Sequence, residues 1–155
     1  MKQSSLSVWL KTIIIIVALC GLAGLIFVLP ALGHSLADSS AMPSAYLPWL
    51  VLLWVVALPC YAALVIAWRI ADRIGADRSF CRENVSDMGK IARLMFACGL
   101  MSLLMAIPAG FLFGRVWFDC VLACLGCAGL GVIAYALACL LRGAVELQEE
   151  NELTV

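Results

Sequence analysis

The side chains with the most reactive chemistry in this 155-residue chain are its eight cysteines. Cys120, Cys124 and Cys127 recur at helical spacing, and the last two form a C-x-x-C pair. An enzyme that passes electrons through such a pair needs a second cysteine pair outside the membrane, and residues 33–45 contain no cysteine. We therefore interpret these cysteines as small packing residues and keep a thiol oxidoreductase as an alternative.

Metal binding is the second chemistry to weigh. Three thiols on one helix could supply part of a zinc site, but a closed site needs about four ligands. The single histidine, His34, lies far from them along the chain, in an outer segment. The sequence contains no phosphate-binding glycine loop, no hydrolase nucleophile elbow and no pair of carboxylates within an apolar run. We expect no cofactor, no metal and no enzymatic activity.

Helices that cross a bilayer must position these side chains. Hydrophobic residues make up 65% of the chain, charged residues 13%, and the mean hydropathy is +1.09. Four apolar stretches approach or exceed the roughly 20 residues that about 30 Å of hydrocarbon requires. They are residues 8–32, 46–68, 94–114 and 117–141. We predict an all-α transmembrane four-helix bundle that forms a single domain over residues 1–155.

The distribution of Lys and Arg predicts the orientation of this bundle. Six of them fall in residues 69–93, and Lys2, Lys11 and Arg142 lie near the chain ends. Only Arg115 lies on the opposite side, so the positive-inside rule places both termini, loop 69–93 and tail 142–155 in the cytoplasm. The first span is longer than a signal-peptide core, and we expect a retained anchor. The predicted location is the cell membrane.

Prolines and small residues predict how the helices pack. Pro59 and Pro108 lie inside spans, where each should bend its helix. Small residues also recur at every fourth position, in a spacing that lets membrane helices approach closely and could also support self-association. The two stripes are Ala106, Gly110 and Gly114, and Ala123, Cys127 and Gly131.

The clearest local signal is a helix start within loop 69–93. With Cys81 at the N-cap, Phe80 and Val85 take the positions of a hydrophobic staple, and Glu83 falls in the first turn. The third helix should therefore begin before the membrane. Its entry turns should be amphipathic and lie at the headgroup boundary. The apolar face comprises Val85, Met88, Ala92 and Met95, and the side chains expected to point elsewhere are Asp87, Lys90 and Arg93.

Two segments carry a resemblance to a known family. The run Phe80-Cys81-Arg82-Glu83-Asn84-Val85, followed by Ile91 and an apolar span, resembles the loop signature of the bacterial four-span proteins of domain-of-unknown-function family 2975. The ending from Leu147 to Val155 is similar to that family's Glu-Asn-Asp-Leu-Thr-Val terminus. Cys81 replaces the usual serine, and Glu152 a frequent aspartate. Such proteins are often found beside a small helix-turn-helix regulator, so the resemblance implies the membrane component of a regulatory pair.

These observations lead to a functional hypothesis. We predict a regulatory or accessory membrane protein with one cytoplasmic surface that binds a small soluble partner, such as that regulator. The expected contact residues are Phe80, Glu83, Asn84, Val85, Glu150, Asn151, Leu153 and Val155. These residues could equally serve only to fix the helix ends against the headgroups.

Transport is the main alternative to this regulatory role. The apolar runs hold no ionisable group deep in the membrane, which disfavours an ion-coupled carrier but allows a transporter or pore for an uncharged or apolar solute. Direct nucleic-acid binding is not expected, because the basic segment is short, mixed with acids and held at a membrane.

Overall fold

The long apolar runs form helices because, in lipid, every backbone amide and carbonyl must find its partner within the chain. The computed structural model describes residues 3–28, 30–31, 46–76, 78–113 and 116–153. Its helices are α1 (Gln3–Ala23), α3 (Tyr46–Gly75), α4 (Arg82–Phe113) and α5 (Val116–Leu153), and a π-helical segment, η1 (Gly24–Val28), continues α1. No strand occurs among the described residues, so the all-α prediction is confirmed there.

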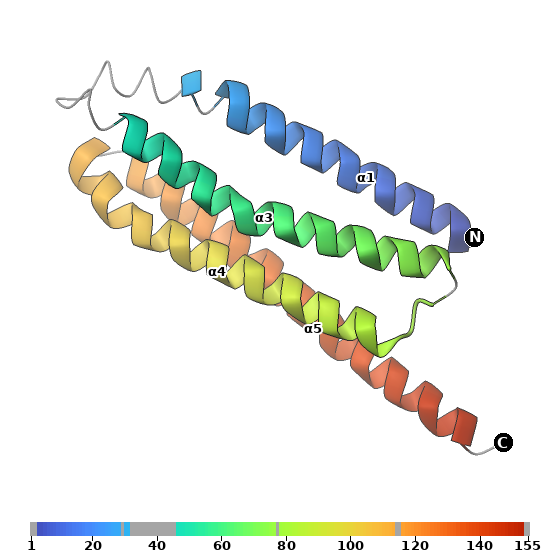
Figure 1. Ribbon diagram of the computed structural model, residues 1–155. Coiled ribbons are helices and arrows are strands. Elements are labelled where there is room, and N and C mark those ends of the chain that lie inside the picture. Colours follow the sequence, from blue (N-terminus) through green and yellow to red (C-terminus); the bar gives the residue numbers. More distant parts are fainter. Residues whose placement is uncertain (1–2, 29, 32–45, 77, 114–115, 154–155) are drawn as a thin grey trace.

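The helices pack in chain order. α1 contacts α3, α3 contacts α4, and the most extensive interface joins α4 to α5. The start of α1, the α3–α4 connector (residues 76–81) and the end of α5 lie at the same end of the bundle, beyond which α5 continues (Figure 1). We call residues 142–153 the α5 extension.

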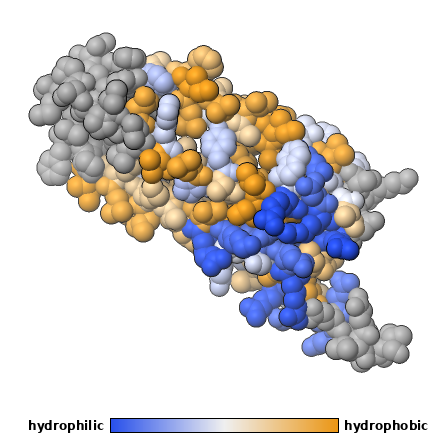
Figure 2. Space-filling view, in the orientation of Figure 1, coloured by the Kyte–Doolittle hydropathy of each residue, from blue (hydrophilic) through white to orange (hydrophobic). Residues whose placement is uncertain are grey.

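Within the described residues, four helices contain segments that are long and apolar enough to cross a membrane. These segments are Ser5–Phe27, Trp54–Gly75, Arg82–Ile107 and Cys120–Gln148. The segments Trp54–Gly75 and Arg82–Ile107 extend closer to the connector than the predicted spans 46–68 and 94–114. The reason is that α3 and α4 continue as unbroken helices up to the connector. Figure 2 shows hydrophobic residues over the body of the bundle and hydrophilic residues gathered at the connector end. This is the pattern of a multi-pass membrane protein.

Small residues occupy the centre of the bundle, and large apolar residues face outward. Ala71, Ala92 and Cys98 are each 1% exposed, whereas Leu125 is 65% exposed. Such an arrangement suits a lipid environment, because close packing of small side chains holds membrane helices together. A Cβ added at Gly131 would lie 3.2 Å from the Phe96 ring, and one added at Gly99 would lie 3.5 Å from the Cys127 Cβ, so the Cys127 and Gly131 part of the second stripe packs closely against α4, whereas Ala123 is exposed. Gly114 of the other stripe lies outside the described residues.

Polar contacts attach α1 to α3. The ammonium of Lys11 lies 2.6 Å from the Asp72 carboxylate and 5.5 Å from the centroid of the Trp68 ring. Two hydroxyls complete the attachment, because the Ser7 Oγ donates to the Ala71 carbonyl at 2.7 Å and the Tyr61 hydroxyl donates to the Ala18 carbonyl at 3.2 Å. α1 is therefore oriented by directed contacts, which apolar packing alone would not supply.

Candidate functional site

The candidate site is the polar end of the bundle, where α4 begins. The Cys81 carbonyl accepts hydrogen bonds from the backbone amides of Asn84 at 3.0 Å and Val85 at 3.4 Å. Helix α4 starts at Arg82, with Glu83 in its first turn. The predicted cap at Cys81 is therefore confirmed. The Phe80 side chain is 55% exposed and Val85 is half-buried, and the staple between them stays a prediction.

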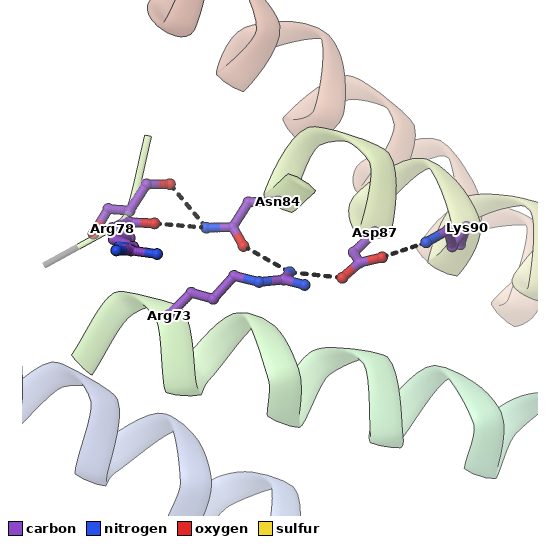
Figure 3. Close-up of polar contacts among 6 residues, drawn as sticks. Arg73, Arg78, Asn84, Asp87 and Lys90 are labelled. Atoms are coloured by element: carbon purple, nitrogen blue, oxygen red, sulfur yellow. Dashed lines mark hydrogen bonds and ion pairs between the residues drawn. The ribbon is translucent and has the colours of Figure 1, made fainter. Parts of the chain in front are cut away.

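Asn84 holds the connector against the bundle. Its side chain is 1% exposed, and its amide nitrogen Nδ2 donates to the carbonyls of Arg78 at 3.2 Å and Ser79 at 3.0 Å. Its oxygen Oδ1 accepts a hydrogen bond from Arg73 Nη1 at 3.2 Å (Figure 3). Both ends of the Asn84 amide are therefore engaged within the chain, and its side chain is not presented to a partner in this conformation.

The position of Asp87 differs from the one that the sequence predicts. The pattern predicts that Asp87 points away from the packed face, but this residue is only 2% exposed. Its Oδ2 lies 2.6 Å from Arg73 Nη1 of α3, and its Oδ1 lies 2.6 Å from Lys90 Nζ (Figure 3). The prediction for Asp87 is wrong because a cation from the neighbouring helix accompanies the carboxylate into the interface. Lys90 and Arg93 are exposed, as predicted.

The charges in this cluster are compensated. A buried carboxylate without a partner is costly, and here each carboxylate oxygen faces its own cation. The same guanidinium nitrogen of Arg73 contacts both Asn84 and Asp87. We call Arg73, Asn84, Asp87 and Lys90 the Asp87 cluster. It fixes the end of α3, the connector and the start of α4 as one unit.

Replacement of Asn84 by leucine should loosen the connector without unfolding the helices. The carbonyls of Arg78 and Ser79 would lose their donor, and each of these part-buried hydrogen bonds contributes about 0.5–1.5 kcal/mol. We expect faster amide hydrogen exchange across residues 78–84, measured by mass spectrometry in detergent. Arg93→Gln, at an exposed position of the same helix outside this window, should leave the exchange unchanged. Equal exchange rates in Asn84→Leu and the wild-type protein would contradict this role of Asn84.

The α5 extension begins by packing beside the first turns of α4. Between them lies an open groove of about 270 Å³, lined by Arg82, Val85 and Ser86 of α4 and by Arg142, Val145 and Glu146 of α5. Val145 is 6% exposed, which shows that the helix after residue 141 still has a packed face. The Arg142 Nε donates to Glu146 Oε1 at 3.2 Å within the extension.

The predicted contact residues differ in their exposure. Phe80, Glu83 and Glu150 are exposed, whereas Val85 lines the groove and Asn84 is buried. The helical span of α5 includes Asn151 and Leu153, but their side chains lie outside the described residues, as does Val155. The structure therefore brings the start of α4 and the α5 extension together, but it does not expose every residue that the sequence suggested.

The structure also places the cysteines and the histidine that the sequence singles out. The Cys127 sulfur contacts Cys98 of α4 at 3.7 Å, and the backbone carbonyl of Cys124 lies close to Gly99. Within the described parts of the chain, no group of three or more His, Cys, Asp or Glu side chains is placed to hold a metal ion. His34 and Arg115 lie outside the described residues.

Comparison with known proteins identifies a family but no characterised relative. A family model described as "Protein of unknown function (DUF2975)" matches residues 34–155, a range that includes α3, α4, α5 and the whole Asp87 cluster. Neither the curated proteins nor the solved structures gave a match. The polar end described above is thus part of the region that the family shares.

Proposed function

The chain belongs to the DUF2975 family, and we propose that it is a non-enzymatic regulatory or accessory membrane protein. In this proposal the α3–α4 connector and the α5 extension form one surface that binds a small soluble partner. A small helix-turn-helix regulator is the partner class that the family resemblance implies.

The observation that supports this proposal most directly is the meeting of the two segments at one end of the bundle. The extension continues beyond the other helices, and its first turns pack beside the start of α4 (Figure 1). Two apolar side chains at this hydrophilic end are also exposed, Phe80 at 55% and Leu147 at 63%. In this proposal Phe80 and Leu147 supply apolar contacts within an otherwise polar surface.

The charge distribution supports a proposal for the compartment in which the connector and the chain ends lie. Most of the Lys and Arg residues belong to the connector end, and such residues accumulate on the cytoplasmic side of membrane proteins. We therefore propose that both termini and the connector are cytoplasmic and that the chain resides in the cell membrane. Reporter fusions after Gly75 and after Leu153 should both report the cytoplasm, and opposite results would exclude a shared surface.

The test of the proposed surface is partner recovery from solubilised membranes. Phe80→Ala should lower recovery of a helix-turn-helix protein by more than about tenfold, since loss of a central aromatic anchor costs about 2 kcal/mol or more. Glu83→Gln tests, by the same measurement, whether the neighbouring carboxylate contributes to partner binding. Leu125→Ala, which removes a side chain of similar exposure within the membrane segment, is the control and should leave recovery unchanged.

Two results would count against the surface. If Phe80→Ala and Leu125→Ala retained the same proteins in the same amounts, the exposed Phe80 would serve only to anchor the helix end. If no helix-turn-helix protein accompanied the wild-type chain, the proposed partner class would be wrong.

A further inference from the structure

Three thiols from three different helices meet inside the bundle. Cys98 of α4 lies between Cys60 of α3 and Cys127 of α5, with Sγ–Sγ distances of 3.5 Å to Cys60 and 3.7 Å to Cys127. Cys98 is 1% exposed, and the other two are half-buried. We call Cys60, Cys98 and Cys127 the thiol cluster. It differs from the C-x-x-C pair, which lies within a single helix.

Local backbone features create this meeting point. A Cβ added at Gly99 would lie 3.3 Å from the Cys124 carbonyl and 3.5 Å from the Cys127 Cβ, so glycine is what allows α5 to approach the turn that carries Cys98. On the other side, Cys60 directly follows Pro59 inside α3. The Cys98 Sγ also donates to the Val56 carbonyl at 3.5 Å, in the helical turn before that proline.

The distances make the cluster competent for disulfide formation. The sulfurs are already in contact, and a bond of about 2.05 Å needs only a short further approach of each pair. Cys98 can bond only one neighbour at a time, so the disulfides Cys60–Cys98 and Cys98–Cys127 exclude each other. The first would join α3 to α4, and the second would join α4 to α5.

We propose that the thiol cluster is an intramembrane oxidation site whose primary product is the Cys60–Cys98 disulfide. A lipid-soluble quinone is the oxidant class, because the cluster lies within membrane segments and the half-buried Cys60 is the member of the pair that an oxidant in the lipid would reach. The two thiols give up two electrons and two protons as the S–S bond forms, and the quinone takes them up to become a hydroquinone. The Cys127 thiolate can then attack the Cys98 sulfur and release Cys60, an exchange with no net redox change.

The experiment uses the full-length protein in lipid nanodiscs with duroquinone, whose four methyl groups block addition of a thiol to the ring. Free thiols are alkylated with a maleimide after denaturation, and disulfide-linked peptides are mapped by mass spectrometry. We expect two fewer alkylated thiols than in the reduced chain and a Cys60–Cys98 linkage. Cys60→Ser should shift the linkage to Cys98–Cys127.

Matched variants decide the outcome. Cys98→Ser should abolish the intramolecular linkage, whereas Cys139→Ser, which replaces an exposed cysteine, should retain it. Size-exclusion elution of Cys98→Ser at the wild-type position would show that the loss is chemical, and the Cys60→Ser shift tests the cluster without altering Cys98. The proposal is overturned if the wild-type chain keeps all its thiols under duroquinone, or if the same linkages persist in Cys98→Ser.

Discussion

Replacement of Arg73 by methionine is expected to destabilise the bundle by about 3 kcal/mol, near the lower end of the range for breaking a buried ion pair from one side. Asp87 would keep Lys90 as a partner, but its Oδ2 would lose the cation that lies 2.6 Å away from α3. The Asp87 side chain is only 3% exposed, so little water reaches the carboxylate to compensate for the lost cation. Reversible unfolding in mixed micelles, followed by far-UV circular dichroism, measures the change.

Two further variants test whether the loss of stability in Arg73→Met comes from the buried charge of Asp87. Arg142→Met breaks an ion pair whose side chains are 74% and 60% exposed, and we expect almost no change in stability. The double variant Arg73→Met with Asp87→Leu removes the stranded carboxylate and should recover part of the loss. An equal loss in Arg73→Met and Arg142→Met would show that burial of Asp87 is not the cause.

Replacement of Gly99 by leucine should be comparably damaging, with a loss of about 1–3 kcal/mol from overpacking of the α4–α5 interface. The first added carbon would already lie 3.3 Å from the Cys124 carbonyl, which belongs to the backbone and cannot rotate away. The rest of the leucine side chain would force α5 outward along the most extensive interface of the bundle. The same unfolding measurement applies, and separation of Cys98 from Cys127 should also prevent their linkage.

Gly126→Leu provides the matched control for this prediction. A Cβ added there meets nothing within 4 Å, so the larger side chain would extend into lipid and stability should be unchanged or slightly higher. If Gly99→Leu and Gly126→Leu unfolded at the same denaturant concentration, close approach at Gly99 would not be what holds α5 in place.

Features set by neighbours along the chain could be predicted from the sequence. Four apolar runs, each long enough to span a membrane, predict four helices. This prediction works because hydropathy is averaged over about 20 residues and requires no knowledge of packing. The helix start at Cys81 was predictable because a cap depends only on the residues around it. The sequence could not show which helix faces meet, since apolar residues occur on all sides of each span and one face looks much like another.

Contacts between helices were missed for this reason. The helical pattern assigns Asp87 to the side away from the apolar face, because a carboxylate is expected outside a packed face unless its partner is known. The sequence nonetheless contained a signal for these contacts. When a short connector joins two helices, residues that lie equally far from its centre along the chain face each other. Arg73 and Asp87 are equally distant along the chain from Phe80, and Cys60 and Cys98 are equally distant from Ser79. Opposite charges in one pair and thiols in the other would have indicated both contacts.

The unbroken course of α5 has a mechanical consequence. The helix runs from Val116 to Leu153 without a proline, so its 38 residues measure about 57 Å at 1.5 Å per residue. A rigid helix of that length acts as a lever. A tilt of about 10° about its Val116 end would move its Leu153 end through about 10 Å. Any reorientation of α5 together with the α4 packed against it would therefore displace the tip of the α5 extension farther than the part of the helix inside the bundle.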